Sequence, residues 1–344
     1  MPGPLETRTG GSIYDRRIAE GLRGRGWEVA IIELESFTHP LQPPLTTAAA
    51  QFSAISDQQC VLIDGLVFGA MPELVAQHGC RLRFVPIVHM ALSQTPGLLP
   101  GERGWLANLE RRALDCARHV VITGHRTLPL VQALSGLLPP ERITCIPPGT
   151  DPIRIDGEHS RSSTPLRILC VANLTPGKGH DILLRALSRA PRRDWVLVCA
   201  GSLVRDLAWA GRIAVLAREL GVDDRVTLAG ELDDRDLESE YATADLVALA
   251  TRGETYGMAV AEAIAHGVPV VSTATGEIAS IAGEGALLAE PDDEAGFATQ
   301  LALAMEQGEV RQQLADGART AALRLPTWND AVTKMIRVLD AVQG

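Results

Sequence analysis

Aromatic side chains and long hydrophobic runs are both scarce in this 344-residue chain, and aromatic residues make up only 4% of it. No apolar run reaches 18 residues and we recognise no secretory leader, so we expect a cytoplasmic protein. Peripheral contact with the inner face of a membrane stays open as an addition to that expectation. Hydrophobic residues form 46% of the chain, which is typical of a folded α/β enzyme and too high for a disordered protein.

Positive charge is not in excess either, because the formal net charge is −10. Residues 1–152 carry 13 basic and 14 acidic side chains, and the rest of the chain is more acidic. The charge balance therefore predicts no nucleic-acid partner. Arg16, Arg17, Arg23 and Arg25 gather on one segment that could touch an anionic surface, although a solvated helix face is the simpler interpretation.

Several well-known site signatures are missing. The six cysteines form no C-x-x-C pair and have no histidine at metal-ligand spacing, so we expect no metal site. We interpret the four that lie in apolar runs as small core residues, namely Cys60, Cys145, Cys170 and Cys199. The chain also lacks a P-loop, a G-x-G-x-x-G fingerprint and a G-x-S-x-G serine-hydrolase elbow.

Short apolar runs alternate with segments of helical periodicity along the chain. The predicted strands are Trp27–Leu34, Cys60–Ile63, Leu82–His89, His119–Thr123, Ile143–Pro147, Leu166–Ala172, Trp195–Gly201, Arg225–Ala229, Asp245–Ala250, Val268–Thr273 and Ala286–Ala289. The predicted helices are Ser12–Arg25, Arg103–Ala117, Asp181–Ala190, Asp206–Leu220, Gly257–His266, Ala295–Gln307 and Val310–Leu323. This alternation predicts an α/β protein with parallel sheets covered on both faces. The polar stretch Arg161–Pro165 divides the strands into two sets, which indicates two doubly wound, Rossmann-like domains.

The beginning of the chain is unusual. Thr9-Gly10-Gly11 is typical of a glycine turn that follows a strand and opens a helix, but the eight residues before it include Pro2 and Pro4. We therefore expect that the first strand is missing and that the natural protein begins upstream.

Two glutamates, Glu254 and Glu262, stand eight positions apart after an apolar strand. Glu254 should lie in the loop at the carboxyl end of that strand, where open parallel sheets bind ligands, and Glu262 on the following helix. The N-terminus of that helix, near Gly257, suits a phosphate. A solvated pair of carboxylates at a helix start is the alternative interpretation.

A second loop comes after the strand Leu166–Ala172 and contains Lys178, just before another helix. A lysine and loop amides at this place can hold a diphosphate, although an ordinary turn lysine would give the same pattern. Glu110, Arg111 and Arg112 lie on a predicted helix, and we interpret them as surface residues.

These motifs together resemble the GT-B glycosyltransferases of the large retaining group, family 4, also described as glycosyl transferases group 1. The resemblance covers nearly the whole chain. It rests on the segment 254–262, the loop 171–179, the glycine turn at 9–11, the segment 146–151 that resembles the family's hinge, and the segment 326–328 with its following helix. The resemblance implies a GT-B fold, with two Rossmann-like domains facing a central cleft. The domains would be residues 1–152 and 153–326, followed by a helix at 327–344 that crosses back to the first domain.

The resemblance also implies roles for individual residues. The catalytic set would be Glu254, which holds hydroxyls of the donor sugar, His89, which faces that sugar, and Lys178, which holds the diphosphate. The residues implied to bind the donor are Gly10, Gly11, Asn173, Lys178, Glu231, Leu232, Thr255, Tyr256, Gly257, Met258 and Glu262. Glu262 would accept hydrogen bonds from the ribose. Asn173 and Pro148 depart from the family, which commonly has arginine and asparagine there.

The implied activity is transfer of a hexose from a UDP- or GDP-sugar to a sugar, lipid or small-molecule acceptor, with retention of configuration and without a bound metal or cofactor. The leaving phosphate would assist same-face transfer. Two alternatives stay open: a catalytically impaired nucleotide-sugar-binding protein, and a nucleotide-sugar epimerase. A core histidine is the alternative interpretation of His89.

Overall fold

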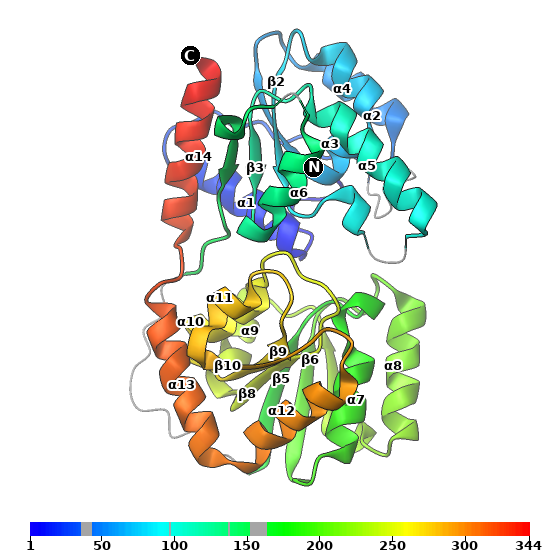
Figure 1. Ribbon diagram of the computed structural model, residues 1–344, viewed down its shortest axis with the longest axis vertical. Helices are drawn as coiled ribbons and strands as arrows, with labels where there is room; N and C mark the ends of the chain where they lie inside the picture. Colours follow the sequence, from blue (N-terminus) through cyan, green and yellow to red (C-terminus); the bar gives the residue numbers. More distant parts are fainter. Residues whose placement is uncertain (36–42, 96–97, 137, 152–163) are drawn as a thin grey trace. The chain divides into compact units, whose positions relative to one another are not determined.

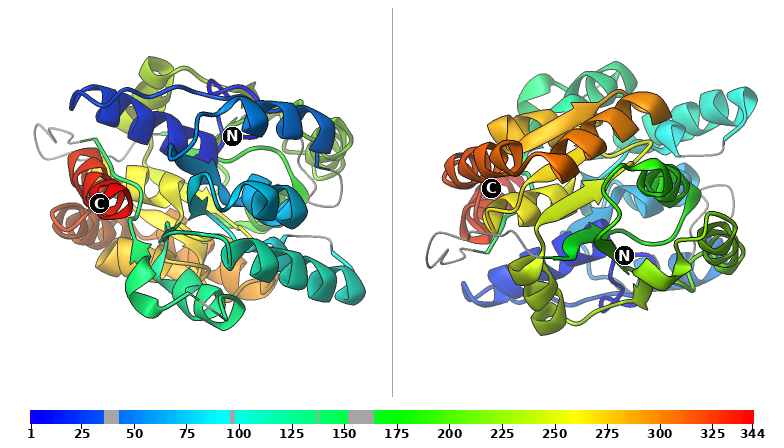
Figure 2. Two further views of the ribbon diagram at one scale, coloured as in Figure 1. Left: turned by 90° about the horizontal axis from the view of Figure 1, so that it is seen from above. Right: turned by 90° about the horizontal axis from the view of Figure 1, so that it is seen from below.

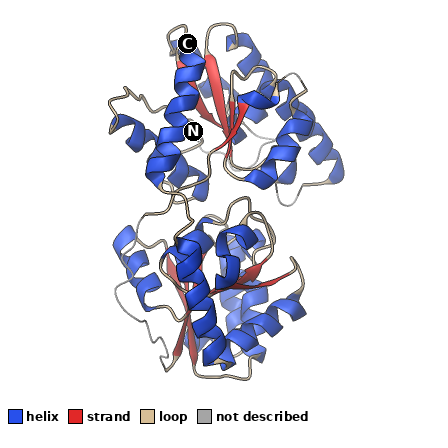
Figure 3. Ribbon diagram, turned by 60° about the vertical axis from the view of Figure 1, so that its left-hand side comes forward, coloured by secondary structure: helices blue, strands red, loops and turns tan. Residues whose placement is uncertain are grey.

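The computed structural model describes residues 1–35, 43–95, 98–136, 138–151 and 164–344 (Figure 1). The chain divides into two compact units, Met1–Gly149 with Pro326–Gly344 and Thr150–Leu325. The expected domain boundary after residue 152, and most of the polar stretch Arg161–Pro165, lie outside the described residues. Each unit has its own parallel sheet, with helices on both faces (Figure 3).

The first unit is built on a four-stranded sheet in the order β1-β2-β3-β4. Its strands are β1 (Cys60–Asp64), β2 (Arg83–Val88), β3 (Val120–Ile122) and β4 (Ile143–Cys145). Its helices are α1 (Gly10–Arg23), α2 (Leu45–Ala54), α3 (Gly65–Ala70), α4 (Pro72–His78), α5 (Pro100–Leu114), α6 (Leu128–Leu134) and α14 (Trp328–Gln343), with 3-10 turns at Leu92–Gln94, His125–Thr127 and Pro140–Arg142.

The central strand β2 shows why this sheet needs cover on both sides. Successive side chains of a strand point to opposite faces. Val85 and Ile87 pack into a core with α1 and α14, while Phe84 and Val88 pack into a second core with α3, α4 and α5. Five of the six residues of β2 are buried, so its near-continuous apolar run is the pattern expected of a parallel strand between two helical layers.

Helix α14 is the last element of the chain and packs along α1 at the beginning of it (Figure 1). The approach is close, because a Cβ added to Gly21 would lie 2.2 Å from Val332 Cγ2. Arg25 donates a 3.3 Å hydrogen bond to Thr333 Oγ1, and the guanidinium of Arg17 lies 5.5 Å from the centre of the Trp328 ring. Two arginines of the expected surface cluster therefore pack against this helix.

The predicted strand Trp27–Leu34 is wrong. Within the described residues these positions form no ladder, and a single bridge joins Leu34 to Pro2. Gly3 N donates to Leu34 O at 3.0 Å, and Leu34 N donates to Met1 O at 2.9 Å. Met1 N also donates to Ile32 O at 3.0 Å, so residues 1–3 pair with the end of this segment only and leave the rest of it without a neighbouring strand among the described residues.

The second unit is built on a six-stranded parallel sheet in the order β10-β9-β8-β5-β6-β7. Its elements run from green to orange in Figure 2. Its strands are β5 (Leu166–Val171), β6 (Trp195–Ala200), β7 (Val226–Gly230), β8 (Leu246–Leu249), β9 (Val270–Thr273) and β10 (Ala286–Ala289). Its helices are α7 (His180–Arg189), α8 (Leu207–Glu219), α9 (Asp234–Thr243), α10 (Met258–Ala265), α11 (Ile278–Ala282), α12 (Glu294–Glu306) and α13 (Gly308–Ala322), with 3-10 turns at Pro176–Lys178, Asp223–Arg225 and Gly283–Gly285.

The order of this sheet contains a switch point. From β5 the chain adds β6 and β7 on one side, and then returns to place β8 on the other side of β5. The loops that leave β5 and β8 therefore diverge at the carboxyl edge of the sheet, and open α/β sheets bind ligands in the crevice outside such a point. This places the loops of Lys178 and Glu254 beside each other.

Glu110, on α5, is not the surface residue that the sequence analysis expected. Arg111 and Arg112 are exposed, but Glu110 is only 1% exposed and its Oε2 accepts a 3.0 Å hydrogen bond from Leu92 N. Burial raises the pKa of Glu110 to about 7, although the Leu92 hydrogen bond opposes the rise. A charged residue on the buried face of a helix cannot be told from a surface one by its neighbours in sequence.

Across the described residues, no helix combines the length and the apolar content needed to cross a bilayer. Of the four cysteines interpreted as core residues, Cys170 and Cys199 are buried, whereas Cys60 and Cys145 are only partly buried. The last two lie on β1 and β4, the edge strands of the first sheet, each of which pairs with a strand on one side only among the described residues.

Candidate functional site

The loop after β5 carries Lys178 and packs directly on the end of β8. It closes with a 3-10 turn, Pro176–Lys178, and then with Gly179, whose φ is +67°. A Cβ on Gly179 would lie 1.8 Å from Ala250 O, so no larger residue fits without moving the backbone. Thr251 Oγ1 and Arg252 N both donate to Gly177 O, at 3.2 and 2.8 Å. These contacts fix the position of Lys178 relative to β8.

Lys178 Nζ donates a hydrogen bond to Glu254 Oε1, and the two charges form an ion pair. Both side chains are partly exposed, at 31% and 24%. The structure therefore brings together the two residues that sequence analysis placed on separate loops. Because each keeps an accessible side, a ligand can reach the pair from solvent.

A second ion pair, missed by sequence analysis, joins the loop after β8 to the start of α7. Arg252 donates two hydrogen bonds of 3.0 Å to the two carboxylate oxygens of Asp181, on the first turn of α7. Such a bidentate pair fixes orientation as well as distance. Burial tends to raise the pKa of Asp181, but the Arg252 hydrogen bonds and charge outweigh it and lower the pKa. The position of Arg252, two residues before Glu254, was the only signal in the sequence.

Glu254, Thr255 and Tyr256 form the loop that leads to Gly257, which has a φ of +100° and precedes the N-terminus of α10. The backbone of Gly276 packs on this loop, since a Cβ there would lie 2.5 Å from both Glu254 O and Thr255 O. Helix α10 begins at Met258, so the positive end of its dipole lies next to the loop. The loop, the helix end and Lys178 thus form one surface suited to an anion.

Glu262 lies on α10, one turn below the loop. Its Oε2 accepts a 2.9 Å hydrogen bond from the Tyr241 hydroxyl on α9, which also donates to Ala259 O at 3.2 Å. The Tyr241 ring stacks on His266 at 4.7 Å, and His266 Nδ1 is 2.8 Å from Glu262 O. Burial, with the nearby charge of Glu262, raises the pKa of Tyr241 well above its ordinary value, so the hydroxyl stays a donor. Tyr241 was not singled out by the sequence.

Three other residues predicted to bind the donor lie at the same edge of the second sheet. Asn173 follows β5, and its Oδ1 accepts a 2.9 Å hydrogen bond from Ser202 N, beyond the end of β6. Glu231 and Leu232 follow β7 directly, after Gly230 at a φ of +74°. All the predicted residues of this unit therefore belong to loops and one helix at the carboxyl ends of parallel strands.

In the first unit, the glycine turn and His89 also come together. A Cβ on Gly11 would lie 3.1 Å from His89 Cδ2, and Gly10 opens α1 beside it. His89 Nε2 lies 3.3 Å from Asp15 Oδ1 and 3.9 Å from Asp64 Oδ2. The two aspartates were missed: Asp15 stands one turn beyond Gly11, and Asp64 is the last residue of β1.

The two aspartates determine the charge of His89. Burial lowers the pKa of His89, but the hydrogen bond with Asp15 and the charges of Asp15 and Asp64 outweigh it and raise the pKa above its ordinary value. The Nε2 and carboxylate atoms of the three residues lie within 4.8 Å of one another, so the same cluster offers donors suited to a divalent cation. His89 is thus part of a charged cluster and not an isolated core histidine.

The cysteine analysis needs one correction. Cys170 and Cys199 are buried as expected, but a histidine does accompany them: His180 lies beside both sulfurs. The three residues come from β5, β6 and the start of α7, so the parallel pairing of the strands, and no linear spacing, brings them together.

With this geometry in view, comparison with known proteins is informative. Residues 153–321 match the family Glycosyl transferases group 1. The matched segment contains Lys178, Glu254 and Glu262. A D-inositol 3-phosphate glycosyltransferase of Xylanimonas cellulosilytica is 29% identical over 74% of this chain and 66% of its own length. The same enzyme of Salinispora arenicola is 29% identical over 58% and 49%. The chain thus spans between about half and two thirds of these curated relatives.

Solved structures resemble the whole chain. Sucrose-phosphate synthase from Thermosynechococcus elongatus aligns with a TM-score of 0.76 at 18% identity, covering 97% of this chain and 94% of that one. HepE of Anabaena, in complex with UDP and glucose, aligns with a TM-score of 0.75 at 18% identity, covering 97% of both chains. At this identity the likeness shows the fold, which is the GT-B type with two Rossmann-like units, as predicted. The family match and the named relatives support a transferase.

Proposed function

We propose that this protein is a glycosyltransferase that moves a hexose from a nucleoside diphosphate sugar, linked to UDP or GDP, to an acceptor hydroxyl with retention of configuration. The observation that carries the proposal is the Lys178–Glu254 ion pair at the switch point of the second sheet. A cation and a carboxylate side by side suit the diphosphate and the sugar of such a donor, and this supports the proposal.

Different residues of the second unit would bind different parts of the donor. Lys178 and the N-terminus of α10 would bind the diphosphate, and Glu254 would then release the lysine to accept hydrogen bonds from sugar hydroxyls. Glu262, held by Tyr241, would accept hydrogen bonds from the ribose. The backbone of Glu231 and Leu232 would line the base, and Asn173 would contact the diphosphate end.

Bond cleavage builds negative charge on the leaving diphosphate and positive charge on the sugar. Lys178 and the helix-end amides stabilise the first where it develops. In a same-face transfer the leaving phosphate oxygen takes the acceptor proton, so no protein nucleophile is needed. His89, with its raised pKa, would hold the sugar as a hydrogen-bond donor, while Gly10 and Gly11 allow close approach of the backbone. We propose that these steps need no resident metal or cofactor.

The acceptor is a separate question from the donor. The relatives named above are D-inositol 3-phosphate glycosyltransferases, which makes D-inositol 3-phosphate the first acceptor to assay. The proposal for the donor does not depend on the result with this acceptor.

The proposal is tested by donor turnover. UDP- and GDP-hexoses are incubated with the protein, with and without acceptor, and release of the nucleoside diphosphate is measured for wild type, Glu254→Ala and Glu219→Ala, an exposed glutamate on α8. We expect turnover in wild type and in Glu219→Ala, and its loss in Glu254→Ala. Donor binding without turnover in the wild type would favour the impaired binding protein, and interconversion of donor sugars would favour the epimerase.

A further inference from the structure

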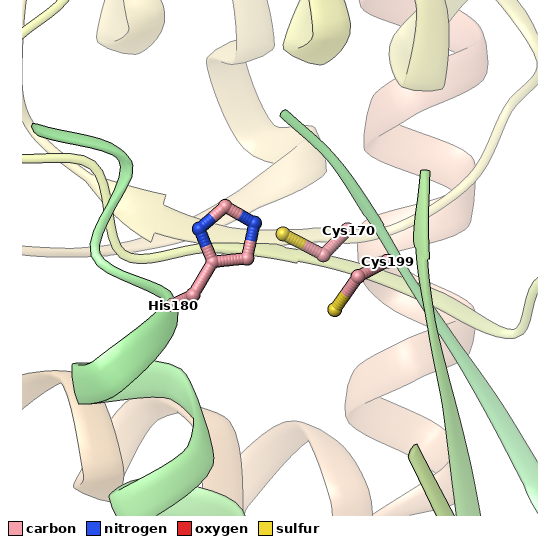
Figure 4. A group of neighbouring side chains, drawn as sticks. All are labelled: Cys170, His180 and Cys199. Carbon is pink, nitrogen blue, oxygen red and sulfur yellow. The ribbon is translucent and has the colours of Figure 1, made fainter. Parts of the chain in front are cut away.

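Two cysteines and a histidine meet in the interior of the second unit (Figure 4). Cys170 and Cys199 are directly paired residues of the neighbouring strands β5 and β6, so their side chains project from the same face of the sheet. His180 opens α7 and turns its ring toward them (Figure 4). All three are at most 1% exposed.

His180 has an unusual environment for a buried histidine. Both ring nitrogens are shielded from solvent and have no nitrogen or oxygen hydrogen-bond partner among the residues that the structure describes. The Cys170 thiol beside the ring is a weak partner for it. Buried polar atoms are nearly always paired, because an unpaired one loses its hydration without replacement. One nitrogen of a neutral imidazole carries a proton and the other a lone pair, and a thiol is only a weak hydrogen-bond partner, so the position suits a stronger partner.

We propose that Cys170, Cys199 and His180 form a buried binding site for Zn²⁺. The three ligand atoms lie within 4.8 Å of one another, so a point exists no more than about 2.8 Å from each. Zinc bonds of about 2.3 Å to sulfur and about 2.0 Å to nitrogen then require the side chains to close in by under an ångström. Binding replaces the two thiol protons, which leave to solvent, and occupies one imidazole nitrogen.

The donor set favours zinc over other ions. Two sulfurs and an imidazole are soft or borderline ligands, and Mg²⁺ or Ca²⁺ would need oxygen ligands. Two thiolates neutralise a divalent ion, whereas Cu⁺ would leave a net negative charge in the interior, which is costly to bury. The cluster is buried, and its three protein ligands leave the fourth position of a tetrahedral zinc ion to a water molecule.

The location gives such a metal a defined task. His180 is two residues beyond Lys178, at the end of the loop that leaves β5, and the cysteines lie near the carboxyl ends of β5 and β6. A metal would therefore tie the end of the Lys178 loop to both strands. This is a positioning role, and it holds whether or not the protein transfers sugars.

The test uses the complete protein, expressed under reducing conditions in medium supplemented with either Zn²⁺ or Co²⁺, so that the ion can enter during folding. We expect one zinc per chain by elemental analysis, and a thiolate-to-cobalt charge-transfer band in the absorption spectrum of the cobalt protein. Wild-type protein that contains no zinc and shows no thiolate band would overturn the proposal, and this result needs no variant.

Variants then assign the ligands. Cys170→Ser, Cys199→Ser and His180→Gln should each reduce bound zinc to background and weaken or shift the cobalt band. Matched controls are Cys80→Ser and His125→Gln, which change an exposed cysteine and an exposed histidine and should keep both signals. Zinc and a thiolate band that persist in a Cys170→Ser/Cys199→Ser double variant would also overturn the proposal. A Cys170–Cys199 disulfide found by mass spectrometry in place of metal would do the same.

Discussion

Lys178 and Glu254 form an ion pair that joins the loop after β5 to the loop after β8. In the absence of a nucleotide, each residue partly neutralises the other. A diphosphate would compete with the Glu254 carboxylate for the same lysine, and a sugar would then find the carboxylate released. On the proposed function the pair would couple binding of the two halves of a nucleotide sugar, and this gives predictions that differ for its two members.

Lys178→Ala should weaken binding of UDP or GDP and of inorganic pyrophosphate alike. A hydrogen bond to a charged group contributes about 1.5–3 kcal/mol, which corresponds to roughly 10- to 150-fold in affinity. The chain contains one other lysine, the exposed Lys334 on α14, and Lys334→Ala is the matched control. Calorimetric titration checks both. Equal affinities in wild type and Lys178→Ala would show that the diphosphate binds elsewhere.

Glu254→Ala should act in the opposite direction on binding. Removal of the carboxylate frees Lys178, and since a partly exposed ion pair contributes up to about 1 kcal/mol, affinity for pyrophosphate should rise by about two- to fivefold. Turnover of the sugar donor should nevertheless be lost, because the carboxylate that accepts hydrogen bonds from the sugar hydroxyls is then missing. Titration and donor hydrolysis measured on one preparation separate the two effects. A parallel loss of pyrophosphate affinity would contradict this account of the pair.

Glu262→Ala should lower the affinity for UDP or GDP about 10- to 100-fold and leave the affinity for pyrophosphate unchanged, because only the nucleotide has a ribose to donate hydrogen bonds. Tyr241→Phe should lower the affinity for the nucleotide about fivefold. The substitution removes the hydroxyl that orients Glu262, while the phenyl ring can still stack on His266. Pyrophosphate is thus the internal control. If the affinity for pyrophosphate fell as much as the affinity for the nucleotide, the substitution would have disturbed the structure of the site as a whole.

The loops and helices around the candidate site show what the sequence could predict and what it could not. Strand β8, Glu254 and α10 were placed correctly because a buried parallel strand gives a continuous apolar run, and its following loop comes at the ligand edge by topology. The partners of the site residues were not found. Asp181, Arg252 and Tyr241 act through contacts between separate loops and helices, which leave no local pattern.

Short helices and buried polar residues also could not be predicted from the sequence. The helices α3 and α11 have six and five residues, too few to show a helical period. Helix α9 has a single buried residue, Tyr241, so its apolar face is hardly visible in the sequence. The mistaken strand 27–34 shows the converse: an alternating apolar pattern gives a strand only where a neighbour runs beside it.

The pKa of His89 tests the charged cluster of the first unit. His89 should titrate above its ordinary pKa of 6.5 in the wild type. Asp15→Asn should lower this pKa, because it removes a negative charge that stabilises the protonated ring, while burial still favours the neutral ring. The measurement is a proton NMR titration of the His89 ring, assigned by comparison with His89→Gln. An unchanged pKa in Asp15→Asn would show that the two side chains do not interact in solution.

Glu110 predicts a pH dependence of stability. Its folded pKa of about 7 is above its ordinary value of 4.5, so the folded chain binds the proton more tightly than the unfolded chain. The contribution of protonated Glu110 to the stability of the folded chain is therefore full below pH 4.5 and is lost as pH rises toward 7. The loss amounts to roughly 3 kcal/mol in the free energy of unfolding.

Glu110→Gln should remove this part of the pH dependence and make the first unit more stable than the wild type above pH 7. Urea unfolding at a series of pH values measures it, with Glu141→Gln, an exposed glutamate of the same unit, as the control. Identical pH profiles for Glu110→Gln and wild type would contradict a buried, protonated Glu110.

The central claim, that a nucleoside diphosphate binds at Lys178, is tested most directly by lysine modification. The chain has two lysines, so acetylation followed by mass spectrometry reports on Lys178 with Lys334 as a reference in the same sample. We predict that UDP or GDP at ten times its dissociation constant slows acetylation of Lys178 about tenfold, leaves Lys334 unchanged, and that NAD has no effect. Acetylation of Lys178 at the same rate with and without either nucleotide would contradict the account.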